Sequence, residues 1–303
     1  MPQLTKGYWR GLHYRYLDGG GDIGILLSHP MALNVRWVEK TMVFLAEQGF
    51  KVWALDLPGH GKSRGHRIGF PCLRWIPILG KIPWAVDFDL QEAGAMVLEF
   101  GKYIKEEKGL QYLVGCGLSF GGIVLSVALG QDLLGIFDTA LVQCYVTRKE
   151  DLRVYENTPR MINLTRKLAE SRLGAAPVIF FIKMSTPLKE YFIHIGMSLK
   201  TLLMVGKWSI DPNTAFFFSK RALVSLHYAE TVPDSQVRIC LIAPEKDAMF
   251  YDYAKILVKR LPNAEIWTIP DALHSVFVNG EDDRRKKKLA EEMAGWIRQN
   301  VPK

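Results

Sequence analysis

Short apolar runs alternate with longer amphipathic segments along most of this chain. Apolar, partly β-branched runs predict strands at residues 24–28, 51–55, 138–143, 237–243 and 265–269. Apolar residues at helical spacing predict helices over residues 35–47, 87–107, 251–260 and 284–299. Gly49 is a plausible C-terminal cap of the first helix, and Asp87 or Asp89 lies near the start of the second. This alternation predicts an α/β fold with a mostly parallel sheet and helices on both faces.

Residues 145–232 interrupt the alternation and are too many for a simple connection between strands. They are rich in helix formers and punctuated by prolines. We interpret them as a helical cap inserted into an α/β core made of residues 1–144 and 233–303. We expect most apolar clusters of this cap to pack against the sheet and some to line an apolar pocket or a membrane-docking surface.

Basic residues outnumber acidic ones, with a net charge of +8 and a pI near 9.2. The predicted cap contributes 13 lysines and arginines against 7 acidic residues, which favours a solvated basic face or peripheral contact with an anionic membrane surface. The basic run at residues 284–288 follows the acidic residues 281–283, and this sequence of charges is typical of a solvated helix face. No nucleic-acid-binding motif accompanies it, so we expect no nucleic-acid partner.

The N-terminal residues and the spacing of the cysteines bear on the cellular compartment of the protein and on whether it binds zinc. The first residues contain no long apolar stretch and no small-residue cleavage site, and no segment offers about 20 uninterrupted apolar residues. The four cysteines form no C-x-x-C pair and read as small buried hydrophobes in a reducing compartment: Cys72, Cys116, Cys144 and Cys240. The chain is therefore expected to be cytoplasmic, with no zinc site.

The stretch at residues 112–122, YLVGCGLSFGG, predicts a strand, a sharp turn and a helix. Its G-x-S-x-G pattern at residues 117–121 is that of a nucleophile elbow, in which a strained turn exposes a serine hydroxyl. The glycines of the pattern allow strand and helix to approach closely. Ser119 is therefore the candidate nucleophile, and Cys116 is not.

A serine nucleophile needs a base that accepts its proton and an acid that orients this base. Among seven histidines, His274 is best placed, because it follows the last predicted strand and precedes the last helix. Asp247 lies between serine and histidine in the order that such sites use. The alternatives for the acid are Glu245, Asp271 and Asp138.

An oxyanion hole should complete the site with two backbone N–H groups. One donor is expected from Phe120, directly after the nucleophile, and the other from the loop after the first predicted parallel strand. Pro30 has no N–H, so the second donor is expected to be Met31, or less favourably Ala32.

The chain resembles the α/β-hydrolase superfamily from about residue 11 to residue 300. The resemblance rests on the elbow and on residues 56–63, DLPGHGKS, which are similar to the D-x-P-G-H-G-x-S turn of that superfamily. Arg64 and Gly65 continue this turn as in the monoglyceride-lipase and lysophospholipase branch. The resemblance implies an α/β-hydrolase fold and a structural role for His60. The chain departs from the family at His29-Pro30, where His-Gly is usual, and just before His274.

The resemblance implies a serine hydrolase acting on carboxylic esters with apolar acyl groups, such as monoacylglycerols or lysophospholipids. Ser119, Asp247 and His274 would be catalytic, Met31 and Phe120 would form the oxyanion hole, and no metal or organic cofactor is implied. An acyltransferase or thioesterase with the same residues is the first alternative. A non-catalytic binding protein is the second. Epoxide hydrolase or dehalogenase chemistry is disfavoured, because those relatives have an aspartate in place of Ser119.

Overall fold

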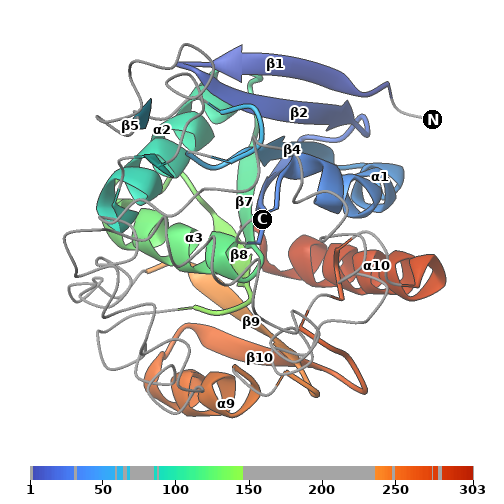
Figure 1. Cartoon of the computed structure of the whole chain (residues 1–303). Helices are drawn as coiled ribbons and strands as arrows, with labels where there is room; N and C mark the ends of the chain where they lie inside the picture. Colours follow the sequence, from blue (N-terminus) through green and yellow to red (C-terminus); the bar gives the residue numbers. More distant parts are fainter. Residues whose placement is uncertain are drawn as a thin grey trace, which may run out of the picture.

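An eight-stranded sheet forms the centre of the computed structural model of the chain (Figure 1). The structure describes residues 3–30, 33–58, 60–63, 67–68, 85–86, 89–145, 236–247, 250–274, 276–278 and 282–302. The strands are β1 (Thr5–Trp9), β2 (Leu12–Asp18), β3 (Ile23–Ser28), β4 (Lys51–Leu55), β7 (Tyr112–Gly117), β8 (Thr139–Val142), β9 (Arg238–Pro244) and β10 (Ala264–Ile269).

The strands follow the order β1-β2-β4-β3-β7-β8-β9-β10. β2 pairs antiparallel with both β1 and β4, and every other pairing in this sheet is parallel. The short strands β5 (Arg67–Ile68) and β6 (Ala85–Val86) form a separate antiparallel pair. β3 has β4 on one side and β7 on the other. The chain therefore adds β4 on one side of β3 and then crosses over to add β7 and the later strands on its other side. In such sheets the ligand site lies at the carboxyl ends of the strands beside this crossover.

Helices cover both faces of the sheet (Figure 1). They are α1 (Glu39–Glu47), α2 (Leu90–Glu107), α3 (Phe120–Gln131), α9 (Tyr251–Arg260) and α10 (Asp283–Asn300), with a 3-10 turn η1 (Val35–Val38) before α1. Buried side chains of α2, α3 and α9 share one apolar core with the sheet, and those of α1 and α10 share the other. The predicted three-layer α/β arrangement is confirmed.

The start and the packing of α2 follow from its sequence. The Asp89 side chain accepts from the Glu92 N–H at 2.9 Å, and the Glu92 side chain accepts from the Asp89 N–H, which together form a capping box. A Cβ on Gly94 would lie 2.5 Å from Cγ1 of Val127, so this glycine lets α2 pack closely on α3. α3 is buried from Phe120 to Gly130 and forms an interior helix under the site.

Most predicted elements differ from the observed ones by one to three residues at an end, and two larger differences concern residues 35–38 and the hairpin of β1 and β2. Residues 35–38, predicted as the start of a helix, form the 3-10 turn η1, where the Asn34 side chain accepts from the Arg36 N–H at 3.0 Å. Neither strand of the β1–β2 hairpin was predicted: β1 is largely exposed and has no run of apolar residues, and β2 is mostly buried but has the polar residues His13 and Arg15 at buried positions. The cap predicted at residues 145–232 lies outside the described residues except for Tyr145, so the domain division stays a prediction.

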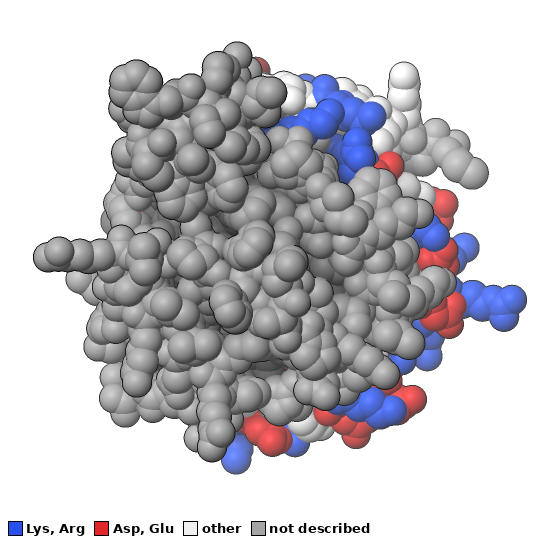
Figure 2. Space-filling view, in the orientation of Figure 1, with Lys and Arg blue, Asp and Glu red and all other residues white. Residues whose placement is uncertain are grey.

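Charged side chains of both signs intermingle on the described part of the face shown in Figure 2, along the edge where α1 and α10 lie. Asp283 of α10 pairs with Lys40 and with Lys286, and the side chain of Lys286 is buried. The prediction that the basic run forms a solvated face is thus wrong for Lys286. Among the described helices, none has the length and apolarity needed to cross a bilayer.

Candidate active site

Four strand ends on the carboxyl edge of the sheet bring the candidate residues together. Ser119 lies two residues after β7, and Gln143 directly follows β8. Asp247 lies three residues after β9, and His274 lies five residues after β10. β7, β8, β9 and β10 are consecutive in the sheet and parallel, so their carboxyl ends point to the same side.

The turn between β7 and α3 holds Ser119 in a strained conformation. Its backbone has φ 55° and ψ −120°, in a region that residues with a Cβ rarely adopt. Gly121 is required beside it, because an added Cβ would lie 2.3 Å from the carbonyl oxygen of Ser28 at the end of β3. A Cβ on Gly117 would lie 2.6 Å from Cα of Gly122. The strand–turn–helix predicted from the glycine pattern is therefore present, with the serine at its apex.

Ser119, His274 and Asp247 form a continuous chain of hydrogen bonds. Nε2 of His274 lies 2.8 Å from Oγ of Ser119, and Nδ1 of His274 lies 2.6 Å from Oδ2 of Asp247. Asp247 and His274 are buried, whereas Ser119 is half-buried. The N–H of Phe250 lies 3.3 Å from the second Asp247 oxygen, and the Phe250 ring stacks on the histidine with the ring centres 5.8 Å apart. Such an arrangement can pass a proton from the hydroxyl to the imidazole.

The alternative acids lie elsewhere. Asp138 accepts hydrogen bonds from Lys105 Nζ at 2.8 Å and from the Leu113 N–H at 2.7 Å. Glu245 accepts from the N–H of Asp271 at 2.8 Å, and the exposed carboxylate of Asp271 pairs with Lys246. Of the four carboxylates considered from the sequence, Asp247 is the one that the structure places on the ring of His274.

Gln143 is a polar residue of this site that the sequence analysis missed. Its side chain is buried, and Nε2 lies 2.8 Å from the carbonyl oxygen of His274, 3.1 Å from Nδ1 of His274 and 3.4 Å from Oδ2 of Asp247. Glutamine belongs to no acid–base or nucleophile motif, so residue type gave no signal. Its place directly after a parallel strand was the available clue.

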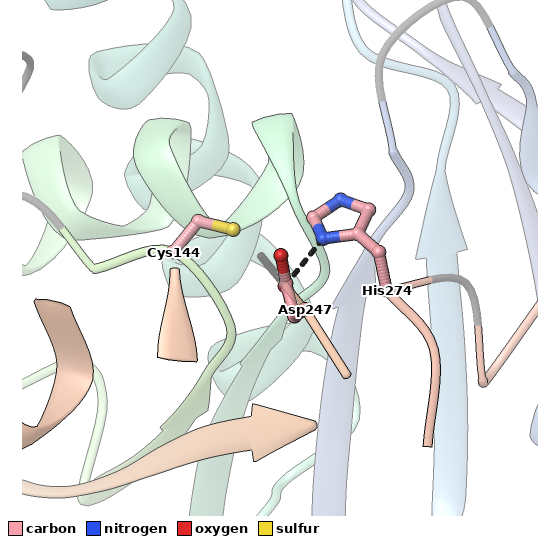
Figure 3. A group of neighbouring side chains, drawn as sticks. All are labelled: Cys144, Asp247 and His274. Atoms are coloured by element: carbon pink, nitrogen blue, oxygen red, sulfur yellow. Dashed lines mark hydrogen bonds and ion pairs between the residues drawn. The ribbon is translucent and has the colours of Figure 1, made fainter. Parts of the chain in front are cut away.

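Cys144 lies beside the Asp247–His274 pair (Figure 3). Its sulfur, a carboxylate oxygen of Asp247 and a ring nitrogen of His274 lie within 4.8 Å of one another. The 2.6 Å between Asp247 and His274 is a hydrogen-bond distance, whereas two ligands of one tetrahedral zinc ion lie about 3.4 Å apart. Burial and the Asp247 charge raise the pKa of the Cys144 thiol well above its usual value, so it stays protonated. These three residues therefore fit a hydrogen-bonded pair with a neutral thiol beside it better than a metal site.

The other described cysteines match their predicted role. Cys116 and Cys240 are buried within β7 and β9, and burial raises the thiol pKa of each, to about 12 for Cys116. Both thiols remain neutral at physiological pH and behave as small apolar side chains. Cys72 lies outside the described residues.

Asp56, which directly follows β4, is the centre of a buried polar cluster that links β2, η1 and the turn after β4. Its carboxylate accepts from the ring of His13 at 2.8 Å, from the Val35 N–H at 2.8 Å and from the Lys62 N–H at 2.9 Å. Burial raises the pKa of Asp56, but these hydrogen bonds outweigh it and hold the pKa below its usual value. Gly61 must be a glycine here, because it has φ 52° and a Cβ would lie 2.3 Å from the carboxylate.

Two buried histidines lie between this cluster and the elbow. His29 accepts the Leu57 N–H at 3.0 Å through Nε2, so its Nδ1–H donates to the Pro30 carbonyl at 2.8 Å. His60 bonds through Nδ1 to the Pro58 carbonyl at 2.9 Å, and its ring centre lies 5.9 Å from that of Phe120. Burial lowers the pKa of both, to about 3 for His60, and both rings are neutral at physiological pH.

The predicted oxyanion donors lie only partly within the described residues. Phe120 is the first residue of α3, and N–H groups in the first turn of a helix have no acceptor within the helix. The Gly121 and Gly122 N–H groups donate to the carbonyls of Leu118 and Ser119, so the Phe120 N–H is the candidate donor to a developing negative charge. Met31 lies outside the described residues, so its predicted role as the second donor stays a prediction.

Residues 27–291 match the sequence model of the alpha/beta hydrolase family, a span that includes the elbow, Gln143, Asp247 and His274. The chain belongs to the alpha/beta hydrolase family. This match and the mostly parallel eight-stranded sheet confirm the resemblance and the fold class predicted from the elbow and the DLPGHGKS turn.

Solved structures of the same fold align with 97% to 100% of this chain. A soluble variant of monoglyceride lipase from Saccharomyces cerevisiae, in complex with a substrate analog, has a TM-score of 0.64 at 14% identity, covering 100% of this chain and 96% of its own. A thermostable carboxyl esterase from Bacillus coagulans, in complex with glycerol, has a TM-score of 0.64 at 14% identity and covers 99% of each chain. A putative epoxide hydrolase from Klebsiella pneumoniae has a TM-score of 0.64 at 11% identity and covers 97% of each chain. No curated protein sequence matches the chain. At such low identities these similarities establish the fold alone.

Proposed function

We propose that this protein is a serine hydrolase that cleaves carboxylic esters with apolar acyl groups, through an acyl-enzyme on Ser119. The observation that carries the proposal is the unbroken chain of hydrogen bonds from Ser119 Oγ through His274 to Asp247, at 2.8 and 2.6 Å. The strained backbone of Ser119 supports it, because strain of this kind persists where the surrounding structure enforces it and is common at active sites.

Acylation begins when Oγ of Ser119 attacks the ester carbonyl carbon. Nε2 of His274 accepts the hydroxyl proton during the attack, and the carboxylate of Asp247 stabilises the resulting imidazolium through Nδ1–H. The tetrahedral intermediate then collapses, the ester C–O bond breaks, and His274 returns the proton to the departing alcohol. Asp247 keeps its charge throughout and holds the ring in the orientation that presents Nε2 to the serine.

Negative charge develops on the carbonyl oxygen during this attack and needs donors that are already in place. The Phe120 N–H at the start of α3 is the first donor, and the helix dipole of α3 favours negative charge at the same point. The Met31 N–H is proposed as the second. The loop that carries Met31 follows β3, the neighbour of β7 in the sheet, which supports this assignment.

Deacylation repeats these steps with water as the nucleophile. His274 removes a proton from the water, which attacks the acyl carbonyl, and Ser119 leaves with the proton from His274. An alcohol, amine or thiol acceptor in place of water would give an acyltransferase, and a thioester substrate would give a thioesterase. Both variants use the same residues, and product analysis distinguishes them from ester hydrolysis.

Monoacylglycerols and lysophospholipids are the substrate class that we favour. Residues 56–65 resemble the monoglyceride-lipase and lysophospholipase branch, and a monoglyceride lipase and a carboxyl esterase share the fold. The apolar clusters of the predicted cap, which lies outside the described residues, would provide the acyl pocket. The proposal of an apolar acyl group therefore rests on sequence resemblance and composition.

A p-nitrophenyl ester series from acetate to long acyl chains tests the proposal. Turnover should rise with chain length in the wild type and vanish in Ser119→Ala. Ser126→Ala is the matched control, because this buried serine of α3 donates to the Gly122 carbonyl at 2.7 Å, and the variant should retain activity. Equal rates in wild type and Ser119→Ala would overturn the assignment of the nucleophile.

Two further assays separate the alternatives. Product analysis with competing alcohol and amine acceptors reports acyl transfer if the acyl group appears on the acceptor rather than as free acid. An activated fluorophosphonate should label Ser119 in the folded protein. Absence of labelling would favour a binding protein on a hydrolase fold.

A further inference from the structure

Gln143 connects the elbow to the loop that carries His274. Its backbone N–H donates to the carbonyl of Gly117 at 2.8 Å, directly before the elbow turn. Its own carbonyl oxygen abuts the first turn of α3, where a Cβ on Gly122 would lie 1.7 Å away. The backbone of residue 143 is thereby held between β7 and α3, and the buried side chain extends from this fixed base toward His274.

The surroundings determine which end of the Gln143 amide faces the histidine. Nε2 lies 2.8 Å from the backbone carbonyl oxygen of His274, and a carbonyl oxygen only accepts hydrogen bonds. The NH₂ group must therefore point there. Its second hydrogen faces Oδ2 of Asp247 at 3.4 Å and Nδ1 of His274 at 3.1 Å. Because Nδ1–H already donates to Asp247 at 2.6 Å, Nδ1 cannot accept, and the carboxylate is the acceptor that remains.

We propose that Gln143 is a positioning residue of the catalytic site. It fixes the backbone of His274 and donates to the same Asp247 oxygen that orients the ring. His274 lies on a loop, five residues beyond the end of β10, and loops move more than the strands that they connect. A donor anchored at the end of β8 restricts this loop, so Nε2 stays within reach of Ser119. The inference rests on the proposed hydrolase function, and it assigns Gln143 no contact with substrate.

Two substitutions separate hydrogen bonding from space filling. Gln143→Met keeps an unbranched side chain of similar length but removes the donor. Gln143→Glu keeps the shape but places a carboxylate oxygen against the carbonyl of His274 and the carboxylate of Asp247. We expect kcat to fall about 10- to 100-fold in Gln143→Met and further in Gln143→Glu, because a misplaced catalytic group costs rate at this scale. KM should stay within about twofold of wild type, because substrate binding is not altered.

Thr139→Val is the matched control. Thr139 is buried at the start of β8, the strand that Gln143 follows, and its hydroxyl donates to the Arg238 carbonyl at 2.8 Å, away from the site. This variant should lose stability without a change in kcat. Chemical denaturation of each variant identifies any that fail to fold, and the kinetics are compared among folded variants.

The ¹⁵N spectrum of the His274 ring gives a readout that does not depend on activity. In the wild type the proton held on Nδ1 by Asp247 should give two distinct ring-nitrogen signals. In Gln143→Met the loop of His274 is less restricted, so the ring should leave Asp247 part of the time. The proton then exchanges between Nδ1 and Nε2, and the two signals should move together. An unchanged spectrum together with wild-type kcat in both Gln143 variants would overturn the inference. If wild type cleaves no ester and Ser119 is not labelled, the proposed function fails, and the ring spectrum alone then decides the role of Gln143.

Discussion

Gly122, one residue beyond the G-x-S-x-G pattern, makes the closest backbone approach near the site. It lies in the first turn of α3 against the end of β8. A Cβ added here would lie 1.7 Å from the carbonyl oxygen of Gln143 and 3.2 Å from that of Gly117. Both obstacles are backbone atoms at the ends of β7 and β8, so they cannot rotate away as a side chain would. We therefore predict that Gly122→Ala is strongly destabilising.

The magnitude follows from two opposing effects. Ordinary van der Waals contact begins at 3.4 Å, so the helix or the strand end must move by about 1.7 Å. Overpacking of a well-packed core typically costs about 1–3 kcal/mol, and this displacement lies at the upper end of that range or above it. Alanine in place of glycine within a helix returns at most about 1 kcal/mol. The free energy of unfolding should therefore fall by about 2 kcal/mol or more.

Urea unfolding followed by tryptophan fluorescence measures this difference, with Gly295→Ala as the control. Gly295 also lies inside a helix, α10, but an added Cβ would meet nothing within 4 Å. Gly295→Ala should raise the free energy of unfolding by about 0.5–1 kcal/mol through helix propensity alone. If Gly122→Ala proved as stable as wild type, the close packing of α3 on β8 would be refuted.

Three further predictions concern single side chains. Asp247→Asn should lower kcat about 10³- to 10⁴-fold in ester kinetics, whereas Asp271→Asn, which alters an exposed carboxylate, should change it little. His60 has a pKa of about 3 when folded and 6.5 ordinarily, so below pH 6.5 the unfolded chain binds the extra proton. Urea titrations should show stability falling by up to about 1.4 kcal/mol per pH unit from pH 6 to 4, and a shallower fall in His60→Gln. Asp283→Asn leaves the buried ammonium of Lys286 without its carboxylate 2.8 Å away and should cost about 1–2 kcal/mol in thermal denaturation, more than Lys286→Met.

Each of these predictions has a contradicting outcome. Similar losses of kcat in Asp247→Asn and Asp271→Asn would remove Asp247 from the proposed mechanism. An unchanged pH slope in His60→Gln would mean that this histidine takes up its proton equally well in the folded and unfolded chain. If Asp283→Asn were as stable as wild type, the Val278 carbonyl, 3.5 Å from the Lys286 ammonium, or water would compensate for the lost carboxylate.

Most of the central fold could be predicted from the sequence because its elements bury one apolar face or lie wholly inside. The strand predicted at residues 51–55 and the helix at 251–260 agree with β4 and α9 to the residue. β1 could not be predicted, because it is a largely exposed strand paired on one side, and its few apolar residues carry no periodic signal. The burial of Lys286 could not be predicted, because the sequence pattern of charged residues indicates a solvated helix face. It does not reveal that the Lys286 ammonium pairs with Asp283, one helix turn earlier.

The candidate site divides in the same way. Ser119, Asp247 and His274 were selected because their chemistry and chain order follow a known pattern, and the structure places them within hydrogen-bond distance. Gln143 was missed because its contribution depends on where the end of β8 lies relative to β9 and β10. Strand order is a tertiary property, and residue type alone does not encode it.

The end of β8 joins packing and catalysis in one place. The carbonyl of Gln143 sets how closely α3 approaches the sheet at Gly122, and the side chain of the same residue holds the loop of His274. A displacement that relieves the first contact must also move the second. Loss of stability and loss of turnover are therefore coupled at this point, and a stability measurement alone cannot separate them. The two losses can be separated by comparing kcat with KM among folded variants. A change at the end of β8 displaces His274 and so lowers kcat, whereas substrate binding, and with it KM, is not altered.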